Sequence, residues 1–146
     1  MVVRTQTKGQ TPYPSAADLI NMATFPDNFM QQYVIAYDGT KYAMVVNSLS
    51  TLKAFKTLYG GQVDPATGNF RLFESMDLKA SNIEGELRSR GVPENEAKER
   101  ALAVIMKDAG VTLVKAEVNS NTFKKIGAIK EFDSGGKPVY VRADCP

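Results

Sequence analysis

Histidine is absent from this sequence, and its absence excludes more chemistry than any other feature of the chain. Histidine is the most frequent general base near neutral pH, and it completes the serine and cysteine hydrolase triads. Imidazole is also a common ligand of zinc, copper and iron. The sequence therefore predicts no metal site and excludes the commonest classes of hydrolase.

Cysteine is nearly absent as well, since Cys145 is the one example. A single cysteine excludes an intrachain disulfide, and a zinc site would need more thiolates than this. Cys145 stands one residue from the end of the sequence, where a side chain is rarely held rigidly enough to act as a nucleophile. We therefore interpret Cys145 as a frayed residue without a chemical role.

Nucleotide-binding loops are a third absence. The sequence has no Gly-x-x-x-x-Gly-Lys-Ser/Thr loop, no Gly-x-Gly-x-x-Gly fingerprint and no calcium-binding loop of the EF-hand type. Its glycine pairs, Gly60-Gly61 and Gly135-Gly136, are typical of turns. No cofactor is expected.

Several acidic residues stand at helix caps, turns or first helical turns, where a structural role explains them. Asp18 fits a helix cap and Asp38 a tight turn, while Glu94 and Glu96 fit the first turn of a helix. A carboxylate-based active site would need two such groups with separated pKa values. We therefore expect that the protein is not an enzyme.

Long apolar runs are missing too. The run at residues 101–106 is far shorter than the ~20 residues that a membrane-spanning helix needs. No apolar segment follows Arg4 and Lys8, so the sequence predicts no signal peptide. We expect no membrane partner, and a location in the cytoplasm or in a particle assembled there.

The 146 residues are sufficient for one domain with its own core. Residues 1–14, with Pro12 and Pro14, predict an extended or disordered N-terminal arm. Residues 15–146 predict a single α+β domain. Ser15 and Asp18 have the spacing of a capping box, which indicates that the first helix begins there.

The clearest local signal is the segment 31–47, in which Asp38-Gly39 separates two apolar runs. This pair predicts a two-residue type I′ turn. The register that follows pairs Tyr37 with Thr40, Ile35 with Tyr42, and Tyr33 with Met44.

Both faces of this predicted hairpin are largely apolar. Such a hairpin is typical of a strand pair covered on both sides inside a layered fold. The alternative is that one face meets another subunit. The second interpretation makes Tyr33, Tyr37 and Tyr42 candidate residues of a protein interface.

The rest of the chain predicts further helices and strands. Helical spacing or capping signals indicate helices from Ser48 to Gly60, from Ser81 to Gly91, and over residues 93–109. Strands are expected at 70–73 and 111–118, and a second hairpin at 128–132 and 138–142. The predicted class is α+β, with a mainly antiparallel sheet formed by two β-hairpins plus one or two further strands, packed against three to four helices.

The C-terminal region is basic. From Lys115 to Arg142 there are six basic and three acidic residues, a local charge of +3. The helix at 93–109, a possible short helix at 120–127 and the following hairpin resemble the element order of a winged-helix DNA-binding domain. This resemblance implies contacts to nucleic acid by Asn121, Lys124, Lys125, Lys130, Lys137 and Arg142.

Residues 110–118 depart from the winged-helix pattern, because they are long and strand-like where that family has a tight turn. The alternative is that residues 111–118 join the sheet, with the basic residues along its solvated edge. Two functions follow. The first is a non-enzymatic binding or assembly protein that contacts a partner or itself, such as a phage structural subunit or an accessory inhibitor. The second is a DNA-binding protein.

Overall fold

The structure is a computed structural model, and it describes residues 2–5, 13–25 and 30–145. Six strands form one sheet in the order β1-β2-β3-β4-β5-β6, in which β1 is parallel to β2 and all other neighbours are antiparallel. The elements are β1 (Val2–Thr5), α1 (Ala16–Met22), β2 (Gln31–Ile35), β3 (Lys41–Val46), α2 (Leu49–Tyr59), the 3₁₀ turn Gly60–Gln62, α3 (Ser75–Ser89), α4 (Glu94–Asp108), β4 (Val111–Ala116), β5 (Lys124–Phe132) and β6 (Pro138–Cys145).

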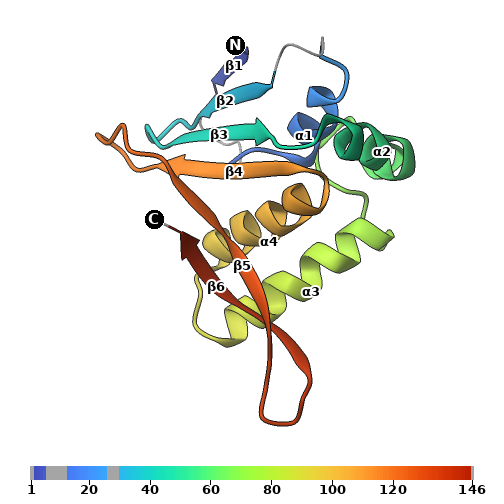
Figure 1. Cartoon of the computed structure of the whole chain (residues 1–146), viewed down its shortest axis with the longest axis vertical. Helices are drawn as coiled ribbons and strands as arrows, with labels where there is room; N and C mark the ends of the chain where they lie inside the picture. Colours follow the sequence, from blue (N-terminus) through green and yellow to red (C-terminus); the bar gives the residue numbers. More distant parts are fainter. Residues whose placement is uncertain (1, 6–12, 26–29, 146) are drawn as a thin grey trace.

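This architecture confirms the predicted α+β class. The hairpins β2–β3 and β5–β6 are joined in one mainly antiparallel sheet by β4, with β1 as a further strand and four α-helices in the described part. Figure 1 shows β1 to β4 side by side at one end of the molecule, and the β5–β6 hairpin crossing in front of α4 and reaching past the helices. Among the described residues, no helix is both long and apolar enough to cross a membrane.

The main core lies between the helices and one face of β2, β3 and β4. Alternate strand residues supply this face, and Val34, Met44 and Leu113 are fully or almost fully buried. The helices contribute residues of equal burial, which belong to the same cluster: Leu19, Met22, Leu52, Ile105 and Met106.

Several helix ends form where the sequence predicts them. The Ser15 hydroxyl accepts from the Asp18 N–H at 3.2 Å, and the Asp18 carboxylate accepts from the Ser15 N–H at 2.7 Å, which confirms the capping box. Ser48 caps α2. Gly110 ends α4 at a φ of 80°, and a Cβ there would lie 2.7 Å from the Ser48 carbonyl oxygen. Only glycine therefore lets the end of α4 approach the start of α2 so closely.

Two expectations for the middle of the chain are wrong. Helix α3 begins at Ser75 and not at Ser81, because Gln62 accepts from the Met76 N–H at 2.9 Å and Asp77 supplies negative charge in the first turn. The segment 70–73 is not a strand. Its one β-type contact is an isolated bridge between Phe70 and Val63.

The register of the first hairpin differs from the predicted one by one residue. Ile35 pairs with Lys41 and Val34 with Tyr42, and the loop holds three residues with Gly39 at a φ of 91°. The Asp38 carboxylate accepts from the Thr40 N–H at 2.9 Å, and this bond lowers the pKa of Asp38. This bond favours the longer loop, a turn followed by a left-handed glycine.

Part of the predicted N-terminal arm belongs to the sheet. Residues Val2–Thr5 form β1 and pair with β2 of the same chain, and Arg4 binds Asp18 at 2.6 Å. Tyr13 is buried in the core, and burial raises its pKa to about 12. Residues 6–12 of the predicted arm lie outside the described residues.

The winged-helix arrangement is wrong. Residues 120–127 form no helix, since β5 begins at Lys124, and β4 pairs with β3 along its whole length. This confirms the alternative, in which the segment after α4 joins the sheet. Cys145 is the last residue of β6, and its backbone lies opposite Lys125.

Candidate functional site

The second face of the sheet, opposite the helices, carries mostly apolar side chains. The pairing places Val3, Tyr33, Ala43 and Val114 in one row across β1 to β4. In an antiparallel sheet with helices on one side, the other side is normally polar. We call the following set the open face: Val3, Tyr33, Ile35, Val45, Val114, Ile129, Val139 and Val141.

Three residues of the open face are exposed, and the other five are half-buried. Val3 is 50% exposed, Ile129 46% and Ile35 36%. The described helices pack on the other side of the sheet. Residues 117–123 cover one part, where the Phe123 and Tyr33 rings meet edge to face with centroids 6.1 Å apart. The remaining apolar surface has no described element over it.

The sheet is split between β4 and β5. These strands pair at only two positions, Val114 with Lys125 and Lys115 with Lys124, and then β5 turns away. The split holds an apolar groove of about 250 Å³, which we call the β4–β5 groove. Ala103 and Val104 of α4 are among its lining residues.

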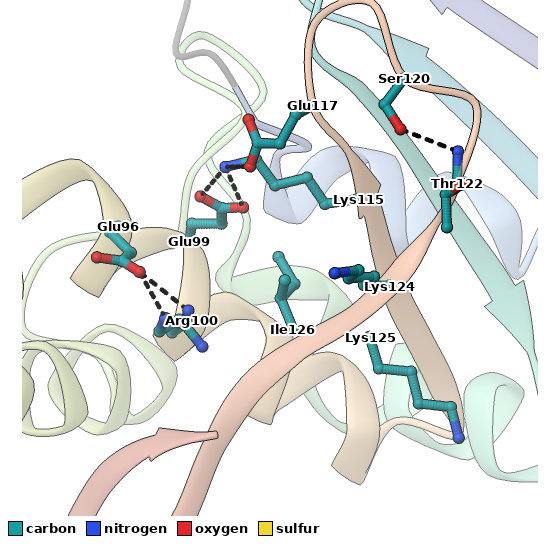
Figure 2. Close-up of a pocket in the computed structure, with 10 residues that line it drawn as sticks. All are labelled: Glu96, Glu99, Arg100, Lys115, Glu117, Ser120, Thr122, Lys124, Lys125 and Ile126. Atoms are coloured by element: carbon teal, nitrogen blue, oxygen red, sulfur yellow. Dashed lines mark hydrogen bonds and ion pairs between the residues drawn. The ribbon is translucent and has the colours of Figure 1, made fainter. Parts of the chain in front are cut away.

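A polar pocket of about 570 Å³ lies beside the split, between α4, the end of β4 and the start of β5 (Figure 2). Its volume is within the range of small-molecule sites. It is lined by Glu96, Glu99, Arg100, Lys115, Glu117, Ser120, Thr122, Lys124, Lys125 and Ile126.

Glu99 and Lys115 form the innermost ion pair of this pocket. The Lys115 Nζ lies 3.3 Å from the Glu99 carboxylate and 3.6 Å from that of Glu117, and 5.7 Å from the Tyr42 ring centroid. Burial raises the pKa of Glu99, although Lys115 opposes this. Burial also raises the pKa of the Tyr42 hydroxyl, which is hydrogen-bonded to Glu99. Lys115 and Tyr42 thus offset part of the cost of burying the Glu99 carboxyl group.

Arg100 is buried and connects α4 to the base of the β5–β6 hairpin. Its Nη1 donates to the Gly127 carbonyl at 2.8 Å and to the Ala143 carbonyl at 2.9 Å. Its Nη2 donates to Glu96 at 2.9 Å, and Arg142 of β6 lies 3.1 Å from the other oxygen of Glu96. These bonds fix the hairpin to the helix layer.

The charges of the pocket are therefore mostly compensated within the protein. Each of its three carboxylates lies within ion-pair distance of Arg100, Lys115 or Arg142. In Figure 2, Lys115 points at the Glu99 and Glu117 carboxylates, and Lys125 points away from them. In the described part of the chain, no group of three His, Cys, Asp or Glu residues could hold a metal ion. This arrangement is typical of an anchoring network.

The structure disperses the residues predicted to contact nucleic acid. Strand alternation turns Lys124 and Lys125 to opposite faces of β5. Arg142 is engaged by Glu96, and the Asn121 side chain accepts from Lys41 at 2.8 Å. Lys130 and Lys137 lie further along the hairpin, away from that base. No winged helix aligns these groups.

The three predicted interface tyrosines are separated as well. Tyr42 is 2% exposed and faces the core, so its assignment to a surface is wrong. Tyr33 lies on the open face and Tyr37 is exposed in the hairpin turn. The one-residue register shift causes this separation, because paired residues share a face.

Sequence reasoning missed the remaining residues of the open face. Val139 and Val141 alternate with Tyr140 and Arg142, and this alternation was a readable signal of one largely apolar face, although Glu131 lies on the same face opposite Val139. Val3 had no such signal, because its strand is short and pairs with a strand about thirty residues away.

A second exposed apolar patch lies between the 3₁₀ turn and α3. Leu72 and Phe73 are 74% and 82% exposed, and Phe73 has a φ of 67°, a strained value for a bulky residue. Its N–H donates to Asp77 at 2.9 Å, which holds the turn.

No family model matches this chain, and comparisons with curated proteins and with solved structures gave no match either.

Proposed function

We propose that this protein is a non-enzymatic binding or assembly protein that acts through protein–protein contacts on the open face. The observation that carries this proposal is an apolar sheet face without a described layer over it, in which Val3, Ile35 and Ile129 are exposed. Contiguous exposed apolar surface in a folded protein marks an interaction site. Covering it with a partner would remove that surface from water.

The β5–β6 hairpin supports the same function. It extends past the helices (Figure 1). The strand pairing places Ile129, Val139 and Val141 on the same side of the sheet as Val114. A partner on this face would contact both the strands of the body and the hairpin. A subunit of a larger particle, such as a phage structural protein, and an accessory inhibitor of another protein both use contacts of this kind.

The polar pocket supports a binding role over an enzymatic one. A catalytic carboxylate needs access to a substrate atom, whereas Glu99 is 5% exposed and paired with Lys115. Arg100 uses its donors on Glu96 and on hairpin carbonyls. Arg100 and Glu96 thus connect the hairpin to α4, and the Glu99–Lys115 pair connects α4 to β4.

An association assay tests the proposal. The mass of the protein in solution is measured over a concentration series, and partner capture is measured from an extract of the source cells. The double variant Ile35→Lys, Ile129→Lys places two charges on the open face. We expect at least tenfold weaker association for this variant, because buried unpaired charge costs several kcal/mol.

The matched control is Leu58→Lys, since Leu58 is an exposed apolar residue of α2, away from the open face. It should associate as the unmodified protein does. A strict monomer that captures no partner contradicts the proposal. Binding to duplex DNA that weakens steeply with salt would instead support the nucleic-acid alternative.

A further inference from the structure

Two free strand edges face each other across the β4–β5 groove. Strand β4 pairs with β3 through one edge along its whole length, but with β5 only at Val114 and Lys115. Strand β5 pairs with β6 from Lys125 to Phe132, but with β4 only at Lys124 and Lys125. Residues 111–113 and 126–132 therefore have no strand partner on the groove side among the described residues.

The β6 edge of the sheet is treated differently. On β6, the Tyr140 N–H donates to Glu86 of α3 at 2.5 Å, and Pro138 has no N–H to offer. A proline and a bonded carboxylate are devices that prevent pairing with another chain. The groove edges of β4 and β5 have neither feature. Their backbone N–H and C=O groups can therefore pair with an added strand, whereas pairing at the β6 edge is prevented.

The groove is lined mainly by apolar residues, and its charged residues are all basic. Val104 of α4 and Ile126 and Ile129 of β5 supply its accessible apolar surface. Val111 and Leu113 of β4 also line the groove but are almost fully buried. The charged residues in its lining are Lys107 and Lys125, and no acidic residue lines it. This combination fits an extended chain with apolar side chains and a nearby carboxylate.

We propose that the β4–β5 groove binds an extended segment of a partner protein, which adds a strand to the free edge of β4. The segment carries apolar side chains toward Val104 and an acidic side chain toward Lys107 or Lys125. Main-chain hydrogen bonds supply affinity in this mode, and the pockets for alternate side chains supply specificity. The inference rests on the proposed protein-binding function and specifies the partner's chemistry.

A designed peptide tests this mode. The probe is a labelled nine-residue peptide of alternating valine and threonine with glutamate at both ends, measured by fluorescence anisotropy. We expect saturable binding, with slower amide hydrogen exchange at residues 111–113. Methylating alternate backbone nitrogens of the peptide should weaken binding roughly tenfold, because strand hydrogen bonds are lost. Equal binding of the methylated peptide would overturn strand addition.

Charge reversal at the groove tests the acidic preference. Lys107→Glu should weaken the glutamate-flanked peptide about two- to fivefold and strengthen a lysine-flanked one. Lys53→Glu makes the same charge change on the exposed side of α2 and should change neither. Identical responses of both variants would contradict the assignment of Lys107.

A filling variant separates the groove from the open face. Val104→Trp, with its melting temperature checked, should abolish peptide binding while partner association through the open face remains. If no peptide binds and Ile35→Lys still blocks association, the groove inference fails and the proposed function stands. If Ile35→Lys has no effect and Val104→Trp abolishes association, the groove alone is the interaction site.

Discussion

The body of the sheet and its C-terminal hairpin are built in opposite ways. In β3 and β4, residues such as Met44 and Leu113 face helices and are almost completely buried. In the hairpin, Phe132 is 71% exposed, and the base is held by Arg100 and by a small cluster in which Ile83 and Leu87 meet Tyr140. The body contains the main buried core, and the hairpin extends exposed apolar residues beyond it.

The largest effect should come from the body. Met44→Ala removes a fully buried side chain from the main core and should lower the free energy of unfolding by about 2–5 kcal/mol. Ile129→Ala, on the open face of the hairpin, should cost about 1 kcal/mol or less. Urea unfolding followed by circular dichroism measures both. Equal losses would remove the distinction between body and hairpin.

The connection between the two regions should give the next largest effect. Arg100→Met removes the donor to one oxygen of Glu96 and to two hairpin carbonyls, and we expect a loss of about 2–3 kcal/mol. Amide hydrogen exchange should become faster in β5 and β6 before it does in β3. The control is Arg88→Met, an exposed pair partner of Glu84 at 3.7 Å, which should cost less than about 0.5 kcal/mol.

The buried carboxyl group of Glu99 should make the free energy of unfolding depend on pH. The pKa of Glu99 is raised by burial above its ordinary value of 4.5, so the folded state binds the proton more tightly than the unfolded state. Its contribution to stability is present below pH 4.5 and is lost as the pH rises through the raised pKa. Glu99→Gln should match the unmodified protein at low pH and become relatively more stable at neutral pH.

Glu94→Gln is the control, and its relative stability should change with pH in the opposite direction. Its hydrogen bond from Lys98 lowers the pKa of Glu94, so the charged form favours folding above the ordinary pKa. Relative to the unmodified protein, this variant should lose stability as the pH rises. Thermal unfolding at a series of pH values measures both trends, and parallel trends for the two variants would contradict the Glu99 assignment.

The smallest effect on stability is expected at the tip of the hairpin. Phe132→Ser changes an exposed side chain that contributes to neither hydrophobic cluster, so the free energy of unfolding should stay within about 0.5 kcal/mol. The same unfolding experiment measures it. A large loss would show that the tip packs against the body.

Local signals predicted much of this fold. The capping box at Ser15, the cap at Ser48 and the stop at Gly110 each depend on residues close in sequence, and the structure confirms them. The Asp38-Gly39 pair correctly placed a hairpin but not its register, because the Asp38 carboxylate bonds the Thr40 N–H and lengthens the loop. A local pattern does not distinguish these two turns.

The candidate site depends on contacts that no local pattern contains. Arg100 reaches carbonyls 27 and 43 residues away, and Lys115 reaches back to α4. The strand character of residues 124–127 was missed because that segment gains its conformation by pairing with β6. The two-sided apolar hairpin suggested that one face meets another subunit, and this interpretation stays a prediction. The structure shows only that part of the open face has no described element over it.

The most direct test of the proposed function is hydroxyl-radical footprinting of the complex with a captured partner or a second copy. Oxidation of Val3, Ile35 and Ile129 should fall on binding, while Leu72 and Phe73 should remain as reactive as in the free protein. Protection of Leu72 and Phe73 with an unchanged open face would contradict the proposal and assign recognition to the strained turn before α3.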